Sequence, residues 1–252
     1  MHEQIPSLGT QPAPRLSTST LEECATRSRV KVIHSFPLFA DIPIESCREI
    51  VAQAQAKDYA RRETIYQEGD SVRRIILLVS GCVKITQLGE NGSEVILRLN
   101  GSGDVIGKTD IGKHARHCSK AQTLSASTAL IWDASVFEAL SVRFPALRKN
   151  TLRSVSSQLE ELEQRFREIS TEKVASRLSR EIVRLLAQVG RVVNGTVEIA
   201  LSREELAQLT GTTLFTVSRL LSDWDQRGIV STRREAVSVN DLVALQQLAE
   251  RD

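Results

Sequence analysis

The hydrophobic pattern of this chain changes from strand-like to helix-like near Phe137, and this change divides the fold. Before it, apolar residues gather in short runs separated by turn residues, at a spacing of about ten residues. After it, apolar residues recur every three or four positions over long stretches, which is the period of an amphipathic α-helix. The sequence therefore predicts an α+β protein with a β-rich N-terminal part and a helical C-terminal part.

The strand signals occupy residues 31–136. Apolar runs such as residues 75–79 are bounded by turns, and the stretch 89–92 contains an Asn-Gly pair that is typical of a tight hairpin. Many short strands favour a barrel or roll, here a double-stranded β-helix or jelly roll. Residues 1–30 contain three prolines and little apolar surface. We expect a mobile tail there, the alternative being an arm that packs on a partner.

Six apolar residues in the segment 137–169 are spaced alternately three and four positions apart. This spacing forms the seam of a coiled coil. At about two and a half heptads the seam is too short to be stable alone, and it pairs best with a second copy of itself. We predict a long dimerisation helix, the alternative being a helix that packs on its own β-part. The seam residues are Leu152, Val155, Leu159, Leu162, Phe166 and Ile169.

Residues 170–252 carry the pattern of a helix-turn-helix. Ser202 and Glu205 have the spacing of a capping box, and Gly211 permits a turn before a second helix over about residues 213–226. Small Ala207 and apolar Val217 suit the contact between the two helices. The alternative is an ordinary helical hairpin. Upstream, Ser170 or Thr171 can cap the first helix of this part, which predicts a hinge there.

The second helix presents polar and apolar residues that suit DNA. Arg219 can fork onto guanine, Thr213 and Thr216 suit phosphate oxygens, and Phe215 suits a thymine methyl. Arginines and acidic residues balance over residues 201–236, so this prediction rests on geometry rather than on charge. The candidate DNA-binding residues of this helix are Thr212, Thr213, Leu214, Phe215, Thr216, Ser218 and Arg219.

A β-hairpin is predicted over residues 229–239, where it would form the wing of a winged helix. Arg233 and Arg234 lie at its tip. They either contact the phosphate backbone or lie in a solvated turn.

This organisation resembles the CRP/FNR family of bacterial transcription regulators. The resemblance covers about residues 34–250 and is most specific over residues 201–211 and 216–221. It implies a homodimer that binds palindromic double-stranded DNA, acts with RNA polymerase and is controlled by a signal sensed in the roll. Family members usually carry Glu where Phe215 stands, three positions before Ser218. The cytosine that this Glu reads is therefore not expected in the half-site.

The resemblance also suggests where an effector would bind. Family members that bind cyclic AMP carry Gly-Glu-Leu and, further on, Arg-Ser, whereas the matching positions here hold Gly107, Lys108, Thr109, Cys118 and Ser119. Without the Arg, a cyclic phosphate loses a bidentate, charge-assisted contact, so we do not expect cyclic AMP to be the signal.

Other cofactors are possible at the same loop. His114, His117 and Cys118 fall within five residues and could hold haem or a metal, or Cys118 could be redox-active. A solvated loop is the alternative. Cys24 stands alone near the N-terminus, so an iron–sulfur cluster is not expected. The sequence leaves the effector unknown.

Composition fits a globular protein, since 41% of the 252 residues are apolar and 25% are charged. Apolar runs are far shorter than the roughly 20 residues of a membrane span, and no secretory signal is recognisable. The four scattered cysteines suit a reducing compartment, so we expect a cytoplasmic protein without a membrane partner. Catalytic motifs are missing, and only the pair His117–Cys118 argues for an enzyme. The main alternative is a cyclic-nucleotide-type ligand-binding module whose helical C-terminus docks a protein.

Overall fold

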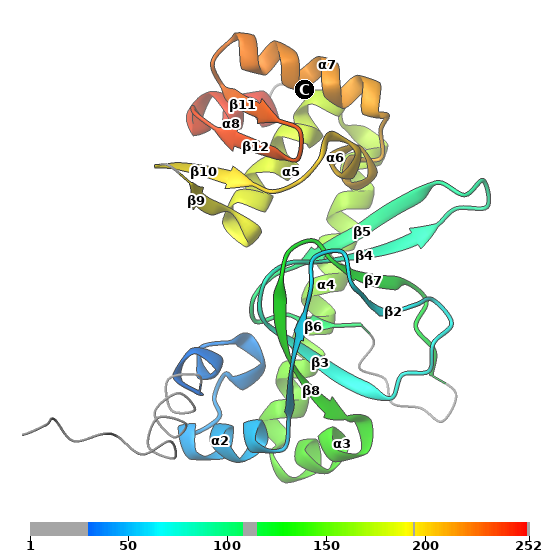
Figure 1. Ribbon diagram of the computed structural model, residues 1–252, viewed down its shortest axis with the longest axis vertical. Helices are drawn as coiled ribbons and strands as arrows, with labels where there is room; N and C mark the ends of the chain where they lie inside the picture. Colours follow the sequence, from blue (N-terminus) through cyan, green and yellow to red (C-terminus); the bar gives the residue numbers. More distant parts are fainter. Residues whose placement is uncertain (1–29, 108–114, 194, 251–252) are drawn as a thin grey trace, which may run out of the picture.

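The computed structural model describes residues 30–107, 115–193 and 195–250, which form two parts (Figure 1). A β-roll fills the lower half of Figure 1, and a mainly helical part lies above it. The long helix α4 (Pro145–Thr171) runs behind the roll and connects the two. Among the described helices, none is long and apolar enough to cross a membrane.

The roll consists of two four-stranded antiparallel sheets, in the orders β1-β8-β3-β6 and β2-β7-β4-β5. Turns with glycine separate the strands as predicted. Gly81, for example, joins β3 to β4 with a φ of 102°, which glycine adopts without strain. The strands are β1 (Gln55–Tyr59), β2 (Thr64–Tyr66), β3 (Arg74–Ser80), β4 (Val83–Leu88), β5 (Glu94–Asn100), β6 (Val105–Ile106), β7 (Lys120–Thr123) and β8 (Ser127–Asp133).

Strand β3 is buried on both of its faces. Ile76 and Leu78 point into the roll interior, whereas Ile75 and Leu77 pack against helical segments outside it. This explains why the strand has a continuous apolar run rather than an alternating one. The outer segments are η1 (Pro37–Phe39), α2 (Ile44–Ala52) and α3 (Ala134–Arg143). Helix α2 lies within the strand-rich segment and was not predicted from the sequence.

The segment 137–169, predicted as one helix, forms parts of two helices. Helix α3 ends at Arg143, and α4 begins at Pro145. Proline lacks an N–H and suits the first turn of a helix, but it forces the preceding residue out of the helical region. Phe144 accordingly has φ −120° and ψ 83°.

The predicted cap between α4 and the next helix is also wrong. Ser170 and Thr171 belong to the last turn of α4, and their hydroxyls donate to the carbonyls of Phe166 and Arg167. Helix α5 (Val174–Val189) instead follows Lys173, whose side chain makes no capping bond. Because each hydroxyl is bonded to a carbonyl one turn back, neither caps the helix that follows.

The C-terminal part is a winged helix-turn-helix built on α5. Its four-stranded sheet has the order β11-β12-β10-β9. The buried core joins Ile182 of α5 to Val217 and Trp224, and it also includes Ile96 and Leu99 of the roll. The two parts are therefore packed together. The remaining elements are β9 (Arg191–Val193), β10 (Thr196–Ile199), α6 (Arg203–Thr210), α7 (Leu214–Gln226), β11 (Val230–Arg233), β12 (Ala236–Val239) and α8 (Leu242–Glu250).

Candidate nucleic-acid interface

The turn between α6 and α7 has the predicted local geometry. Ser202 Oγ accepts the Glu205 N–H at 3.2 Å, and the Glu205 carboxylate accepts the Ser202 N–H at 2.8 Å. Gly211 follows α6 with a φ of 59°, the left-handed conformation expected of a glycine. Ala207 and Val217 are buried. The capping box and the glycine turn are thus confirmed, and they fix how α7 leaves α6.

The outer face of α7 lies at the end of the molecule away from the roll (Figure 1). Thr213 caps the helix by accepting the Thr216 N–H at 3.2 Å. Phe215 is 77% exposed, and Leu214 is 46% exposed. Arg219 is exposed and makes no hydrogen bond or ion pair with another described residue. Thr212 and Ser218 are half-buried. Of the seven predicted residues, which lie at the start of α7 or just before it, four are exposed and three are half-buried.

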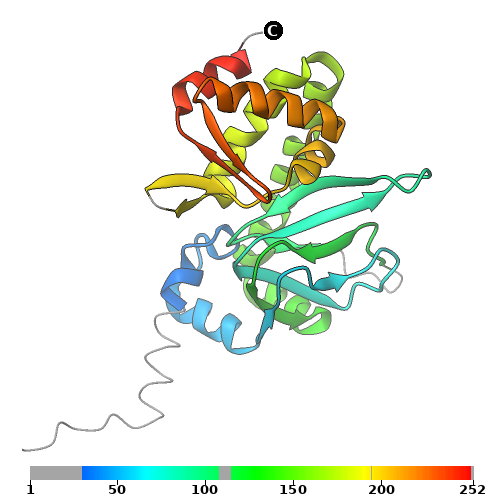
Figure 2. The same ribbon diagram turned by 45° about the horizontal axis from the view of Figure 1, so that its top comes forward.

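The wing lies against the roll, beside the connection between β1 and β2 (Figure 2). Glu235 accepts hydrogen bonds from Arg61 and Arg62, each at 2.7 Å. The hydrogen bond and charge of Arg61, with those of Arg62, lower the pKa of Glu235. Arg233 pairs with Glu198 at 3.2 Å. Arg234 is exposed and forms no pair with a residue that the structure describes. The contact of Glu235 with Arg61 and Arg62 was not predicted from the sequence.

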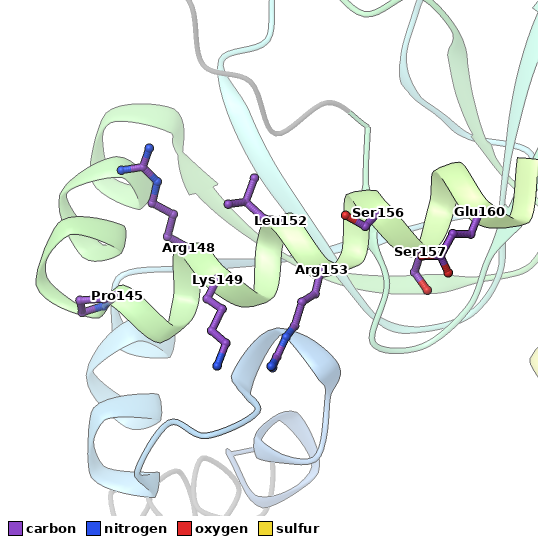
Figure 3. Close-up of a pocket in the computed structure, with 8 residues that line it drawn as sticks. All are labelled: Pro145, Arg148, Lys149, Leu152, Arg153, Ser156, Ser157 and Glu160. Carbon is purple, nitrogen blue, oxygen red and sulfur yellow. The ribbon is translucent and has the colours of Figure 1, made fainter.

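The predicted seam is exposed along α4. Its six residues are between 45% and 73% exposed, although they are apolar and lie on one helix. Ile169 also lies beside Gly211 of the helix-turn-helix. At the start of α4 the same helix borders a groove of about 620 Å³. Figure 3 shows Leu152 and Arg148 on one side of this segment, and Lys149 and Arg153 pointing the other way.

The effector loop is described only in part. The rings of Tyr66 and His117 stack with centroids 3.6 Å apart, directly against Gly107, whose φ is 85°. Burial raises the pKa of Tyr66 to about 12. His117 and Ser119 are buried, whereas Cys118 is exposed, so His117 and Cys118 face different surroundings. Tyr66 was not among the predicted residues. Lys108, Thr109, His114 and Cys24 lie outside the described residues.

Comparison with known proteins places both parts of the chain. Residues 56–143 match the cyclic nucleotide-binding domain, and residues 172–248 match the Crp-like helix-turn-helix domain. Over 206 residues the chain is 24% identical to a CRP-like cAMP-activated global transcriptional regulator from Mycobacterium tuberculosis, covering 81% of this chain and 92% of the relative. The chain belongs to the CRP/FNR family of transcription regulators.

Further relatives agree with this assignment. The fumarate and nitrate reduction regulatory protein of Escherichia coli is 25% identical over 195 residues, covering 77% of this chain and 78% of the relative. The fold is shared with a CRP-family regulator from Thermus thermophilus, with a TM-score of 0.68 and 22% identity over 77% of this chain and 97% of that one. The relatives are transcription regulators rather than enzymes. The C-terminal part is thus the DNA-binding domain of a bacterial-type regulator.

Proposed function

We propose that the protein is a homodimer that binds palindromic double-stranded DNA and whose affinity is controlled by a signal sensed in the roll. The observation that carries this proposal is the open outer face of α7. The inner face of the same helix is buried through Val217, Leu221 and Trp224, whereas Phe215 and Arg219 remain exposed. The ring of Phe215 is not buried by any residue that the structure describes, and an apolar ring suits a thymine methyl.

The proposed dimer forms through α4. Its support is the row of exposed apolar residues, which would be buried if two copies of the helix packed side by side. Leu159→Glu places a charge in the middle of this row, and we expect the variant to sediment as a monomer. Glu163→Gln, a change at an exposed residue of the same helix, is the control. A dimer that survives Leu159→Glu would place the interface elsewhere.

In the proposed complex, Arg219 contacts a guanine in each half-site, and Arg234 of the wing contacts phosphate. Arg233 also contacts phosphate, once its ion pair with Glu198 has opened. Thr213 and Thr216 face phosphate oxygens, and Phe215 favours thymine at the neighbouring position. Bound in this way, the dimer would act through RNA polymerase, in the cytoplasm where its DNA target lies. These roles rest on family membership and on the exposure of the side chains.

The proposed signal is not cyclic AMP. Cys118 stands where a phosphate-binding Arg would be needed, and the stacked rings of Tyr66 and His117 lie against Gly107. Haem at His117 would require this stack to open, because the imidazole is buried in it. An absorption spectrum of the purified protein tests this directly, since bound haem gives a strong visible band and a thiol switch gives none.

A selection of binding sites from random duplexes tests the DNA proposal. The wild type should recover a palindrome with half-sites about 10–10.5 base pairs apart. Arg219→Ala should lose the guanine preference, at a cost of about 1–3 kcal/mol per contact. Arg227→Ala, at the other end of α7, is the control and should keep the preference.

A non-palindromic motif, or one indifferent to Arg219→Ala, would mean that α7 is not the reader. A C-terminal part that docks a protein instead would show no steep dependence of duplex binding on salt.

A further inference from the structure

A cavity of about 450 Å³ opens at one end of the roll, between β1, β3 and the connections that flank β2. Four cationic side chains line it: Lys57, Arg73, Arg74 and Arg116. Asp70 is the only acidic residue among the described lining residues, and one of its carboxylate oxygens already accepts the Gln67 N–H at 2.8 Å. The mouth of the cavity therefore carries a clear excess of positive charge.

The cationic side chains at this mouth form no ion pairs with residues that the structure describes. Lys57, Arg73 and Arg74 are exposed, and the Lys57 ammonium lies 4.4 Å from the centre of the Tyr59 ring. Arg116 donates to the carbonyl of Gly69 at 2.7 Å, a neutral partner. Like charges gathered in this way repel one another, and a bound anion would relieve the repulsion.

The floor of the cavity differs from its mouth. It is formed by Tyr59, Ile65, Ile76, Ile131 and the stacked pair of Tyr66 and His117. Tyr59, Ile76 and Ile131 are buried members of the roll core. The accessible lining is mostly polar, with these apolar side chains contributing the smaller share, and the volume lies within the range of about 300–1,000 Å³ found for small-molecule sites. The cavity thus suits a ligand with acidic groups at one end and an apolar or aromatic body at the other.

This cavity adjoins the place where family resemblance puts an effector, and the two share His117. Its described lining contains neither Gly107, Cys118 and Ser119 nor any residue of α4. Tyr66 and His117 connect the two places, since they line the cavity and also lie against Gly107. A ligand bound in the cavity would therefore contact the same stacked rings of Tyr66 and His117 that lie against Gly107.

We propose that the cavity binds a small organic anion with two negative charges, either an aromatic phosphate monoester or an aromatic dicarboxylate. Arg73, Arg74 and Arg116 pair with its acidic groups, because a guanidinium group binds phosphate or carboxylate through two parallel hydrogen bonds. The aromatic body lies on Tyr59 and Ile131. The role of this anion as the effector rests on the function proposed above, whereas its binding does not.

Isothermal titration calorimetry on the full chain tests the site with four probes. Phenyl phosphate and phthalate carry both the ring and the charge, inorganic phosphate carries the charge alone, and phenol carries the ring alone. We expect one site per chain for phenyl phosphate or phthalate, with an affinity at least about tenfold above that of the two partial probes. Which of the two full probes binds better separates a phosphate ligand from a dicarboxylate.

The double variant Arg73→Gln/Arg74→Gln should weaken this binding at least about tenfold. Both side chains are exposed, so the roll should keep its melting temperature. Arg148→Gln/Lys149→Gln removes the same charge from exposed positions on α4 and should leave binding unchanged. Equal losses in the two double variants, or inorganic phosphate binding as tightly as phenyl phosphate, would show general attraction of anions and overturn the proposal.

Duplex binding measured with and without the tighter probe separates this proposal from the function proposed above. A change in DNA affinity supports the effector role. Binding of the probe without such a change would refute the effector role but leave the site intact. Loss of specific DNA binding in the selection experiment would refute the regulator function while the calorimetric result still stood.

Discussion

Among the described residues, ion pairs join the sensor roll and α4 to the DNA-binding domain at two places, and these places differ in their access to water. Where α4 meets α5, Arg165 donates to Glu181 at 2.9 Å, and the two side chains are 7% and 2% exposed. At the wing, Glu235 pairs with Arg61 and Arg62, and all three side chains are at least 41% exposed. Arginine–glutamate pairs therefore form both a buried junction and an exposed surface contact.

The junction is completed by further bonds. Arg165 also donates to the carbonyl of Leu97 in β5 at 3.1 Å, so it touches the roll, α4 and α5 together. Arg184 of α5 meets Glu168 of α4 through two hydrogen bonds of 2.9 and 2.6 Å. Breaking one partner of a buried pair leaves a charge without compensation, whereas an exposed pair returns to water at little cost. We infer that the junction fixes the angle between α4 and α5 and that the wing contact opens readily.

The largest effect is expected from Arg165→Ala. The variant removes one of the two arginine partners of buried Glu181 and should lower the free energy of unfolding by about 3 kcal/mol, because Arg184 still contacts Glu181. Urea denaturation followed by circular dichroism measures this change. Arg167→Ala, at a 61% exposed position on the same helix, should change stability by less than about 0.5 kcal/mol. Equal effects in the two variants would mean that the junction is open to water.

The pH dependence of stability should identify the same junction. Burial alone would raise the pKa of Glu168, but the hydrogen bonds and charge of Arg184 lower it below its ordinary value of 4.5. A carboxyl group with a lowered pKa stabilises the fold above its unfolded pKa, and this contribution is lost as the pH falls through the folded pKa. Glu168→Gln should therefore flatten the stability profile below about pH 4.5. The matched change Glu163→Gln should preserve the wild-type slope.

Local patterns in the sequence predicted helices and turns near the two contacts but not the contacts themselves. The capping box, the Gly211 turn and the α4 seam depend on residues a few positions apart, so spacing alone predicted them. Pro145 could also have predicted the break between α3 and α4. Arg61 and Glu235 are 174 positions apart, and no local pattern encodes their meeting. The basic cavity was missed for the same reason, because its cations come from separate strands and loops.

The smallest effect is expected at the wing, and its sign carries the information. If the contact restrains the wing, a substitution on either side of the contact should open it and raise DNA affinity. Glu235→Gln and Arg61→Gln/Arg62→Gln should then both strengthen duplex binding about two- to threefold at low salt. A general charge effect predicts opposite signs instead, since the first change removes a negative charge and the second removes two positive ones.

Fluorescence anisotropy with a labelled duplex, at salt concentrations from about 0.05 to 0.5 M, measures both sets of variants. The restraint should fade as salt screens the exposed pair, so the variants and the wild type should converge at high salt after correction for the lost charge. The triple variant should bind the duplex no more tightly than either Glu235→Gln or Arg61→Gln/Arg62→Gln, because the contact can be opened only once. Opposite signs would show that the wing contact does not restrain DNA binding.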